Sequence, residues 1–259
     1  EFNPVPETAS FTGIDWQVRP APLLYGYEPP ANVSHVGPVY VDMHAHTDGG
    51  MSPRTLVRWH LANGFNVTAV SNHNRLGEAA NATREAAARL ANDTGAPLLL
   101  VLAGVEWSNC RLHAGLIGIE EAPPDELVFV KQPSDAQVRA VVDWVHARGG
   151  LVVLHHMAWS AAVQLCEQPT REQVLRWGFD YIEAANGPYL DMQSLLFTQR
   201  HGMGFSAGTD AHGPLTAVYG WTVVYPREFT LHAVMEELRA RLAALAFDGV
   251  PPECAVDAD

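Results

Sequence analysis

Three groups of imidazole and carboxylate side chains stand at widely separated positions of the sequence, each at the end of a short apolar run. They are Asp42, His44 and His46 in the first group, His73 in the second, and Asp210 and His212 in the third. Buried parallel strands read as short apolar runs, and the carboxyl ends of barrel strands meet at one mouth. Histidine and carboxylate ligands gathered at that mouth predict a multi-metal hydrolase.

The spacing within two of these groups brings side chains together. His44 and His46 are two residues apart, so on an extended segment both point to the same side. Asp210 and His212 repeat this spacing after the third run. The first pair predicts a two-imidazole metal site, although in a chain with twelve histidines such a pair can also arise by chance.

Glu106 ends an apolar run of eight residues, positions 98–105. A carboxylate there is costly to bury unless it is paired or binds a cation. One interpretation is a salt-bridged residue at a strand end. The other is a glutamate that bridges two metal ions, with one oxygen on each.

Four further residues are candidates on their position alone. His155 and His156 end an apolar run at residues 151–154, and because adjacent strand residues face opposite ways, we expect only one of them to enter the site. His113 begins a predicted strand, where a lone histidine is more often structural. Asp48 lies in a glycine-rich turn, where aspartate is common for reasons of turn geometry.

Strands and helices alternate from residue 39 onward, which predicts an α/β fold with a parallel sheet. The later predicted strands cover residues 67–71, 98–105, 113–119, 151–154, 181–184, 204–207 and 220–224. The predicted helices cover residues 53–63, 78–93, 134–148, 170–177, 190–201 and 230–246, with N-caps at Ser52, Ser134 and Thr170. About seven such units favour a TIM-like barrel over an open sheet.

The chain divides into an arm and one domain. Residues 1–38 are rich in proline and aromatic residues without periodicity, so we expect an extended N-terminal arm packed across the domain. Residues 39–259 then form a single metallohydrolase barrel, since no linker or internal repeat divides them.

The net charge is −13, and Lys131 is the only lysine. Long polyanions such as DNA need a basic surface, so nucleic acid is not an expected partner. A small phosphorylated substrate is compatible with this charge, because metal ions supply positive charge locally. No apolar run is long enough to span a membrane. The oligomeric state stays open.

Cysteines and glycosylation signals bear on the compartment. The three cysteines, Cys110, Cys166 and Cys254, are too few for a disulfide scaffold and are consistent with one disulfide or with three free thiols. Asn-x-Ser/Thr sequons begin at Asn32, Asn66, Asn81 and Asn92. Only about one would be expected by chance from ordinary Ser/Thr usage. The excess favours a secreted or lumenal glycoprotein over a cytoplasmic protein.

Taken in order, the motifs resemble those of the polymerase-and-histidinol-phosphatase (PHP) superfamily over residues 39–213. Asp42-x-His44-x-His46 resembles its opening motif, and residues 48–53 resemble its Asp-Gly-x-x-x-Pro. Residues 71–74, Ser-Asn-His-Asn, resemble its Thr-Asp-His-Asn. The remaining matches are Gly104-Val105-Glu106, His113, Leu154-His155-His156 and Gly208-Thr209-Asp210-Ala211-His212. One such motif would be weak, whereas six motifs in order, with His113 among them, are specific.

The resemblance implies a distorted (β/α)7 barrel that binds two or three divalent ions of Zn, Mn or Fe. By motif position, one ion would bind His44, His46, Glu106 and Asp210. A second would share Glu106 and bind His113 and His156, the latter preferred because the family usually has a small residue before this ligand. A third would bind Asp48, His73 and His212. Asp42 would orient a ligand histidine from behind.

Two departures from the family pattern concern these ligands. Asn72 replaces the usual aspartate before His73, which changes the hydrogen bonds open to that histidine. The loop between His46 and Asp48 is shorter than in the usual motif, which affects how Asp48 reaches the site.

The resemblance implies hydrolysis, mostly of phosphate esters, by a hydroxide that bridges two of the ions and attacks in line. The implied catalytic residues are Glu106, Asp210, His212, Arg75 and His155, and the expected substrate contacts are Arg75, Arg111 and Asn186. Arg75 follows the His73 motif and Arg111 precedes His113, although each can be an ordinary surface arginine. The expected substrate is a small-molecule phosphate mono- or diester.

Two other hypotheses stay open. Some stand-alone relatives that act outside the cytoplasm hydrolyse amide, carbamate or carboxylic ester bonds, and few basic residues flank the site motifs here. Degenerate relatives that have lost ligands are non-catalytic metal-binding or interaction modules. In this sequence every expected ligand has a candidate residue, which disfavours the non-catalytic hypothesis.

Overall fold

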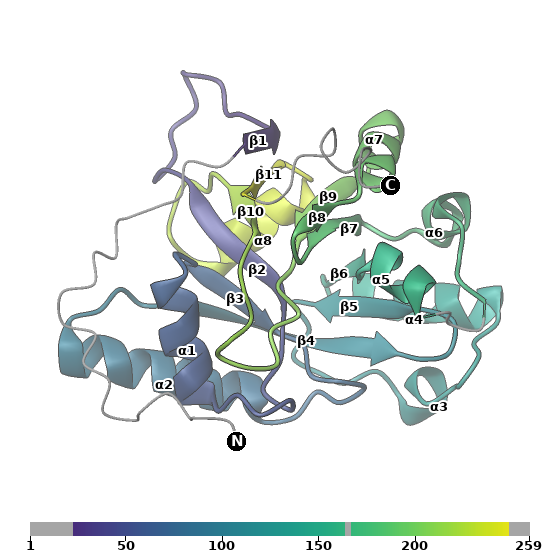
Figure 1. Cartoon of the computed structure of the whole chain (residues 1–259), viewed down its shortest axis with the longest axis horizontal. Coiled ribbons are helices and arrows are strands. Elements are labelled where there is room, and N and C mark those ends of the chain that lie inside the picture. Colours follow the sequence, from purple (N-terminus) through teal and green to yellow (C-terminus); the bar gives the residue numbers. More distant parts are fainter. Residues whose placement is uncertain (1–22, 164–166, 249–259) are drawn as a thin grey trace, which may run out of the picture.

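The computed structural model describes residues 23–163 and 167–248, in which eleven strands form one sheet flanked by helices (Figure 1). The strands are β1 Leu23–Gly26, β2 Val39–Ala45, β3 Val67–Val70, β4 Leu100–Ser108, β5 His113–Ile117, β6 Leu151–Leu154, β7 Tyr181–Asn186, β8 Tyr189–Leu190, β9 Gly204–Ala207, β10 Gly220–Val224 and β11 Ala243–Phe247. The helices are α1 Pro53–Ala62, α2 Ala79–Thr94, α3 Asp125–Val128, α4 Asp135–His146, α5 Met157–Ala162, α6 Arg171–Trp177, α7 Met192–His201 and α8 Leu231–Arg239.

Three helices begin at the caps that the sequence predicts. The hydroxyls of Ser52, Ser134 and Thr170 each accept a hydrogen bond from the backbone N–H three residues further on. Gln137 and Gln173 complete capping boxes at the second and third of these by bonding back to the N-cap backbone. A cap of this kind stabilises a helix by roughly 1 kcal/mol, so the helix starts are set locally.

The sheet is mixed, and its parallel pairs lie in two groups. β2, β3 and β4 are parallel neighbours, and so are β6, β7 and β9. β5 lies between the groups and runs antiparallel to both β4 and β6. The predicted α/β fold is therefore confirmed. The uniform alternation of strand and helix is not, because residues 109–112 connect β4 to β5 without a helix.

The sheet curls so that its late strands approach its early ones. β9 pairs with β7, and it meets β10 through the side chain of Thr222. The Thr222 hydroxyl accepts the N–H of Ala207 at 2.9 Å and donates to the carbonyl oxygen of Ala207 at 3.0 Å. This side-chain contact takes the place of a backbone ladder. The result is a curled open sheet, compatible with a distorted TIM-like barrel.

The predicted C-terminal helix over residues 230–246 is wrong in its second half. α8 ends at Arg239, Arg241 has a left-handed φ of 59°, and β11 begins at Ala243. All five residues of β11 are buried, and β1 and β10 pair with its two edges. Burial and pairing in the sheet outweigh the helix propensity of this Ala- and Leu-rich run.

The expected N-terminal arm falls only partly within the described residues. β1 pairs antiparallel with β11, so residues 23–26 belong to the sheet and do not lie across it. Residues 27–38 then lead to β2 without regular secondary structure. The arm expected at residues 1–22 lies outside the described residues, as do Cys166 and Cys254.

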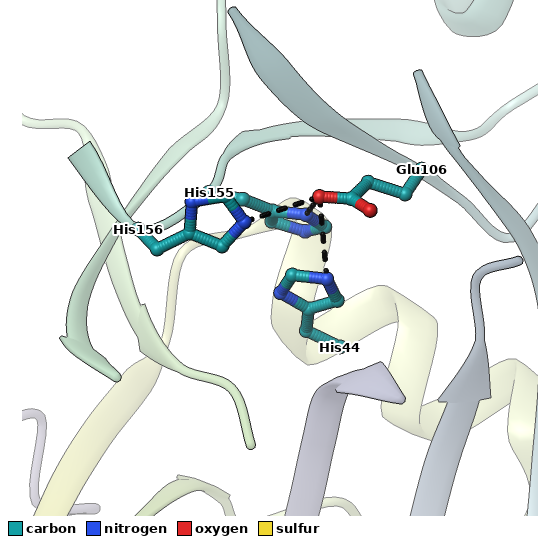
Figure 2. Close-up of side chains that lie close together, drawn as sticks. All are labelled: His44, Glu106, His155 and His156. Carbon is teal, nitrogen blue, oxygen red and sulfur yellow. Dashed lines mark hydrogen bonds and ion pairs between the residues drawn. The ribbon is translucent and has the colours of Figure 1, made fainter. Parts of the chain in front are cut away.

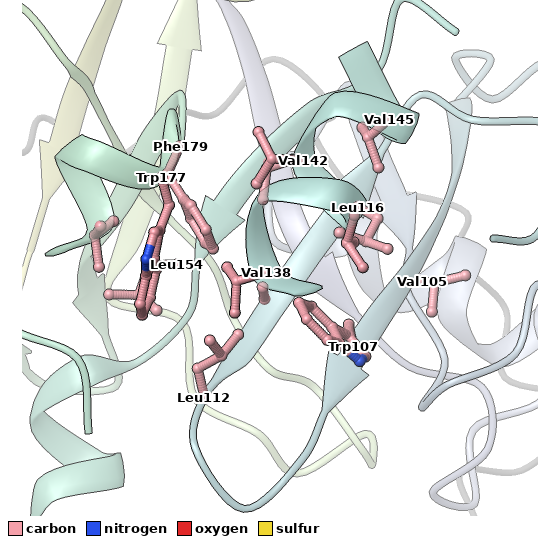
Figure 3. Packing of buried hydrophobic residues seen from close by; sticks show 14 of the residues in the cluster. Val105, Trp107, Leu112, Leu116, Val138, Val142, Val145, Leu154, Trp177 and Phe179 are labelled. Atoms are coloured by element: carbon pink, nitrogen blue, oxygen red, sulfur yellow. The ribbon is translucent and has the colours of Figure 1, made fainter. Parts of the chain in front are cut away.

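A buried apolar cluster under α4 fixes the strands that carry part of the site (Figure 3). α4 contributes Val138, Val142 and Val145, whose spacing of four and three residues places them on one helix face. Trp107 of β4 belongs to the same cluster and is fully buried. Burying each such side chain contributes about 1.5–3 kcal/mol, so the end of β4 is held in one position.

Candidate metal centre

The nine predicted ligands meet at one edge of the curled sheet. Most lie at or just after the carboxyl ends of parallel strands: His44, His46 and Asp48 for β2, His73 for β3, Glu106 for β4, His156 for β6, and Asp210 and His212 for β9. The exception is His113, the first residue of β5. Because β5 runs antiparallel to β4, its first residue lies at the same edge as the end of β4.

His44, His46 and Asp210 form the innermost group. The Nε2 atoms of the two histidines are 3.0 Å apart, and each lies 3.3 Å from Oδ1 of Asp210. Ligand atoms about 2.1 Å from a tetrahedral ion are roughly 3.4 Å from one another, so these atoms have the spacing of a metal site. Both imidazoles are fully buried, whereas the Asp210 side chain is 29% exposed. The group therefore opens toward solvent on the Asp210 side.

Glu106 lies between groups of histidines, and its two carboxylate oxygens face different ones. Oε1 lies 3.5 Å from Nε2 of His44 and 3.2 Å from Nε2 of His156 (Figure 2). The same oxygen lies 3.1 Å from Nδ1 of His113. Oε2 lies 3.1 Å from Nε2 of His73. This division of the two oxygens is the arrangement that a metal-bridging glutamate requires.

A further group surrounds Asp48 on the outer side of the site. The Asp48 carboxylate lies 3.2 Å from Nδ1 of His46 and 3.0 Å from Nδ1 of His73. The His212 ring stacks on His46 with centroids 4.1 Å apart, and Gly49 leaves room for it, since a Cβ there would overlap the His212 ring. The short loop after His46 therefore still brings Asp48 to the site. The His73 and His212 side chains, 39% and 40% exposed, line the open face.

The Asn72 side chain forms its hydrogen bonds with Thr47, in the loop that follows β2. Its amide oxygen accepts the backbone N–H of Thr47 at 2.8 Å, and its amide nitrogen lies 2.8 Å from the Thr47 hydroxyl. Asn72 therefore joins the loops that follow β2 and β3. Asp48, not the residue at position 72, contacts the ring of His73.

His155 and His156 both enter the site, so the expectation that only one would do so is wrong. β6 ends at Leu154 and His156 has a φ of 24°, so strand alternation no longer applies at these residues. Nε2 of His156 and Nδ1 of His155 lie 3.2 Å and 3.5 Å from the same Glu106 oxygen (Figure 2). The His155 ring stacks on His44 at 3.6 Å, and its Nε2 is buried with no hydrogen-bond partner among the described residues.

Backbone strain is concentrated at this edge of the sheet. Asn74, His156 and Asp210 have left-handed φ angles of 52°, 24° and 51°, and Arg241 is the one other described non-glycine residue with positive φ. Such a conformation costs about 1–3 kcal/mol and persists where the surroundings fix it. The backbone is therefore locally destabilised at His156 and Asp210, where these residues turn into the site.

Two buried polar residues at the site were not predicted from the motifs. Glu183, on β7, lies 3.3 Å from Nδ1 of His44. His60, on α1, lies 2.9 Å from Oδ2 of Asp42. Asp42 itself accepts the backbone N–H of His44 at 3.1 Å, so it holds a ligand histidine through its main chain. The signal for Glu183 is a lone carboxylate inside the apolar run at residues 181–185, where burial demands a partner.

The structure does not bring Arg111 to the site. Its guanidinium lies 2.7 Å from the Asp135 carboxylate and 2.9 Å from the carbonyl oxygen of Pro133, and it lies over the ring of Trp177. These contacts fasten the loop after β4 to the start of α4. The expected contact between Arg111 and substrate is therefore replaced by a structural role, because the charge is already paired.

The other two expected substrate contacts remain near the ligands. Arg75 is exposed, two residues beyond His73, and forms no hydrogen bond or ion pair with another described residue. Asn186 donates to Oε2 of Glu183 at 3.1 Å, so it lies behind the ligands. Of the two, Arg75 is the one free to meet an incoming anion.

The site carries an excess of negative charge when its imidazoles are neutral. Its carboxylates are Asp48, Glu106, Glu183 and Asp210, and no lysine or arginine among the described residues pairs with them. Burial alone would lower the pKa of His44, but the carboxylates of Asp210, Glu106 and Glu183 raise it well above its usual 6.5. Burial would raise the pKa of Glu106, yet the imidazoles around it, led by His44, hold it well below its usual range. Cations are therefore strongly favoured here.

The donor atoms fit divalent transition metals. Three groups have ligand atoms within 4.8 Å of one another: His44, Glu106, His155 and His156; His46, Asp48, His73 and His212; and His44, His46 and Asp210. Mixed imidazole and carboxylate donors suit Zn, Mn or Fe. Burial and the neighbouring His44 lower the pKa of His155 to about 4, so at neutral pH this ring offers a lone pair. His155 thus adds a donor beside His113, which the resemblance placed in this group.

The metal-free protein should lose stability as the pH rises from 6.5 to 9. The raised pKa values of His44 and His46 contribute stability that is present below their usual 6.5 and is lost as the pH rises through the folded values. The lowered pKa values of Glu106 and Asp210 contribute stability above their usual 4.5 and 3.8 that is lost on acidification. The lowered pKa of His155 costs stability as the pH falls from 6.5 toward 4, so the melting temperature in chelator should be highest near pH 6.5.

Metal-loaded protein should show the opposite trend above pH 6.5, since protons and metal compete for the same nitrogens. A chelated sample whose melting temperature climbs from pH 6.5 to 9 would contradict the charge assignment.

No family model and no curated protein match the sequence. In structure, the chain is similar to a two-domain protein from Bacteroides vulgatus that contains a predicted PHP-like metal-dependent phosphoesterase. The TM-score is 0.64 at 18% identity, over 86% of this chain and 68% of that one. It is also similar to a candidate metal-dependent phosphoesterase from Bifidobacterium adolescentis, with a TM-score of 0.53 at 18% identity over 88% and 100% of the two chains.

A third similar structure is the lesion-specific endonuclease EndoQ from Pyrococcus furiosus, with a TM-score of 0.50 at 13% identity over 78% of this chain and 56% of that one. Identities this low establish the fold alone. The chain has the fold of the PHP-like metal-dependent phosphoesterases, an α/β fold whose curled open sheet is compatible with the distorted TIM-like barrel that the motif resemblance implied.

Proposed function

We propose that this protein is a PHP-type metal-dependent hydrolase that cleaves a small-molecule phosphate mono- or diester with two or three Zn, Mn or Fe ions. The observation that carries the proposal is Glu106, a buried carboxylate with its two oxygens divided between sets of imidazoles. Burying a carboxylate is costly unless it is paired or binds a cation, and among the described residues the partners of this one are imidazoles, with no lysine or arginine beside it. When bound, divalent ions supply Lewis acidity and an acidified water.

The chain's own residues hold and orient the reacting groups. His44, His46 and Asp210 would hold one ion, with Glu106 shared. Nδ1 of His212 lies 2.8 Å from the carbonyl oxygen of Asp210, which only accepts, so the proton sits on Nδ1 and Nε2 is free to bind an ion or take a proton. This tautomer supports the predicted roles of His212 as a metal ligand and as a catalytic residue at the open face.

Two exposed side chains are placed to meet the substrate. Arg75, two residues after His73, pairs with no other described residue and would contact an anionic oxygen. Trp159, on α5, is half exposed and lies edge-on to the His156 ring at 4.9 Å, so it offers an apolar surface next to the ligands. Ligand sites commonly combine such apolar walls with a few polar groups.

Hydrolysis of an amide, carbamate or carboxylic ester is the second candidate. Its support is the lack of any arginine or lysine bonded to the ligands within residues 23–163 and 167–248. A phosphoryl group would depend on the metals and Arg75 for its neutralisation, whereas an acyl substrate needs fewer cations.

A small molecule is favoured over nucleic acid as the substrate. One structurally similar protein is a lesion-specific endonuclease. This chain has a net charge of −13 with one lysine, and DNA binding depends on neutralising many phosphates. We therefore propose a small-molecule substrate for this chain, although it shares its fold with an endonuclease.

A substrate panel tests the proposal. Metal-loaded protein should hydrolyse p-nitrophenyl phosphate or bis-p-nitrophenyl phosphate faster than p-nitrophenyl acetate or a p-nitrophenyl carbamate, measured as kcat/KM at pH 8. Faster acyl hydrolysis would establish the second candidate instead. Metal-loaded protein that cleaves none of them would point to the non-catalytic hypothesis.

We also propose a secreted or lumenal location. Three sequon asparagines are exposed, namely Asn32, Asn81 and Asn92. The amide oxygen of Asn66 accepts the N–H of Tyr40 at 2.9 Å, so this fourth sequon is a poorer glycan acceptor. Cys110 is disulfide-bonded, and disulfides persist mainly in oxidising compartments. Within the described ranges, no helix has the length and apolar character needed to cross a membrane.

A further inference from the structure

Glu183 is a buried carboxylate at the metal centre to which the proposed mechanism gives no role. It lies within β7 and is 3% exposed. Its Oε1 lies 3.3 Å from Nδ1 of His44, and its Oε2 accepts the backbone N–H of His156 at 2.7 Å. Oε2 also accepts the side-chain amide of Asn186 at 3.1 Å. One carboxylate therefore contacts two ligand residues that belong to different parts of the sheet.

The two ring nitrogens of His44 face different partners. Nε2 faces Nε2 of His46 at 3.0 Å and Oδ1 of Asp210 at 3.3 Å. Nδ1 faces Oε1 of Glu183. An ionised carboxylate only accepts, so the proton of a neutral His44 sits on Nδ1 and the lone pair on Nε2. This is the tautomer that a metal ion facing Nε2 requires.

Glu183 holds His156 through the backbone. The 2.7 Å bond from the His156 N–H fixes a residue whose φ of 24° is unfavourable for a side chain with a Cβ. That conformation turns Nε2 of His156 toward Glu106, at 3.2 Å. The same carboxylate thus orients one ligand by its ring and another by its main chain.

The approach of Glu183 to His44 depends on space left by Gly208. A Cβ at position 208 would overlap Oε1 of Glu183 and would come within 2.6 Å of Cβ of His44. The φ of Gly208 lies outside the left-handed region, so the backbone does not itself demand glycine. The glycine is needed for the room that this carboxylate takes up.

Asp180 provides a comparison with a purely structural carboxylate. It immediately precedes β7, accepts the N–H of Val152 at 2.9 Å, and pairs with His146 at 2.8 Å. Asp180, just before β7, bonds to the backbone of β6, and Glu183, within β7, bonds to the backbone just after β6. Only Glu183 also reaches an imidazole of the candidate metal centre.

Resting on the proposed metal centre, we infer that Glu183 is a positioning residue for metal binding. It fixes the Nδ1–H tautomer of His44 and the backbone of His156, and so couples a ligand on β2 to a ligand after β6. Glu183 bonds to two ligand residues and to Asn186 and would not itself bind the ion, so loss of its charge weakens metal binding although no ligand side chain is removed.

Zinc titration of metal-free protein against a chromophoric chelator tests this role. Glu183→Gln keeps the side-chain volume but loses the charge that holds the His44 proton on Nδ1. It should bind at least one Zn²⁺ about 10–100-fold more weakly, the usual effect of removing a partner behind a ligand. Gly208→Ala should lose at least as much affinity, because it displaces the same carboxylate and also crowds Cβ of His44. Asp180→Asn is the matched control and should bind Zn²⁺ as the wild type does.

The outcomes separate this inference from the proposed function. Equal Zn²⁺ affinity in Glu183→Gln and wild type would overturn the inference and leave the hydrolase proposal standing. A wild-type chain that binds no Zn²⁺ would overturn the hydrolase proposal as well. If the variants do not fold, as judged by circular dichroism, the tautomer of His44 in the wild-type protein decides. Long-range ¹H–¹⁵N spectra of the zinc-loaded protein should show His44 as the Nδ1–H tautomer, and an Nε2–H tautomer would refute the inference.

Discussion

Glu106→Gln should lower kcat by about 1,000-fold or more, because it removes the charge shared between the imidazole groups. An amide presents one oxygen and one NH₂ group, so it cannot offer an anionic oxygen to both sides of the site. The side-chain volume is unchanged and the residue is buried, so the metal-free variant should keep the wild-type fold. The measurement is kcat on the best substrate of the panel, beside the circular dichroism spectrum.

Asp180→Asn is again the matched control, since it neutralises a buried carboxylate that lies away from the ligands. It should retain wild-type turnover. A Glu106→Gln enzyme that keeps about a tenth of wild-type kcat or more would remove Glu106 from the bridging position, whatever its effect on stability.

Chelation should reduce turnover to the uncatalysed background, and readdition of Zn, Mn or Fe should restore it. The donor atoms belong to ten side chains that converge on one edge of the sheet, so removing the ions removes the charge that attracts and activates the reactants. Loading should also stabilise the fold by about 2.7 kcal/mol for each site at a metal concentration 100-fold above its Kd. Differential scanning calorimetry with and without metal measures this gain.

Turnover that survives exhaustive chelation would contradict the metal requirement. A loss of activity without a loss of melting temperature would show that the ions act in catalysis but do not bind the folded chain tightly. Protein stripped of metal and then reloaded controls for irreversible damage.

The strands of the fold could be predicted because buried strands appear in the sequence as short apolar runs. The runs at residues 67–70, 151–154 and 204–207 are short and bounded by polar residues or glycine, and each is a strand. An apolar run does not show the direction of its strand, so the antiparallel placement of β5 was not predicted. The run at residues 243–247 follows a helix without a glycine or proline between them, and only its pairing with β1 and β10 makes it a strand.

The candidate site was predictable where ligands follow strand ends and less so where contacts are made through space. His44, His46 and Asp210 could be placed together from spacing and strand order, and the structure brings them within 3.3 Å. His155 was predicted as a catalytic residue but not as a donor beside His156, because the turn that follows β6 depends on a backbone conformation that sequence spacing does not reveal. Glu183 lies 139 residues from His44 in the chain, and only the folded sheet shows their contact.

The most direct test of the central claim is anomalous X-ray diffraction from crystals loaded with Mn²⁺ or Zn²⁺. Data collected on both sides of the metal absorption edge should show two or three peaks, one about 2.0–2.2 Å from Nε2 of His44 and Nε2 of His46, and another on the far side of the Glu106 carboxylate. Fully loaded crystals with no peak within ligand distance of Glu106 would contradict the account.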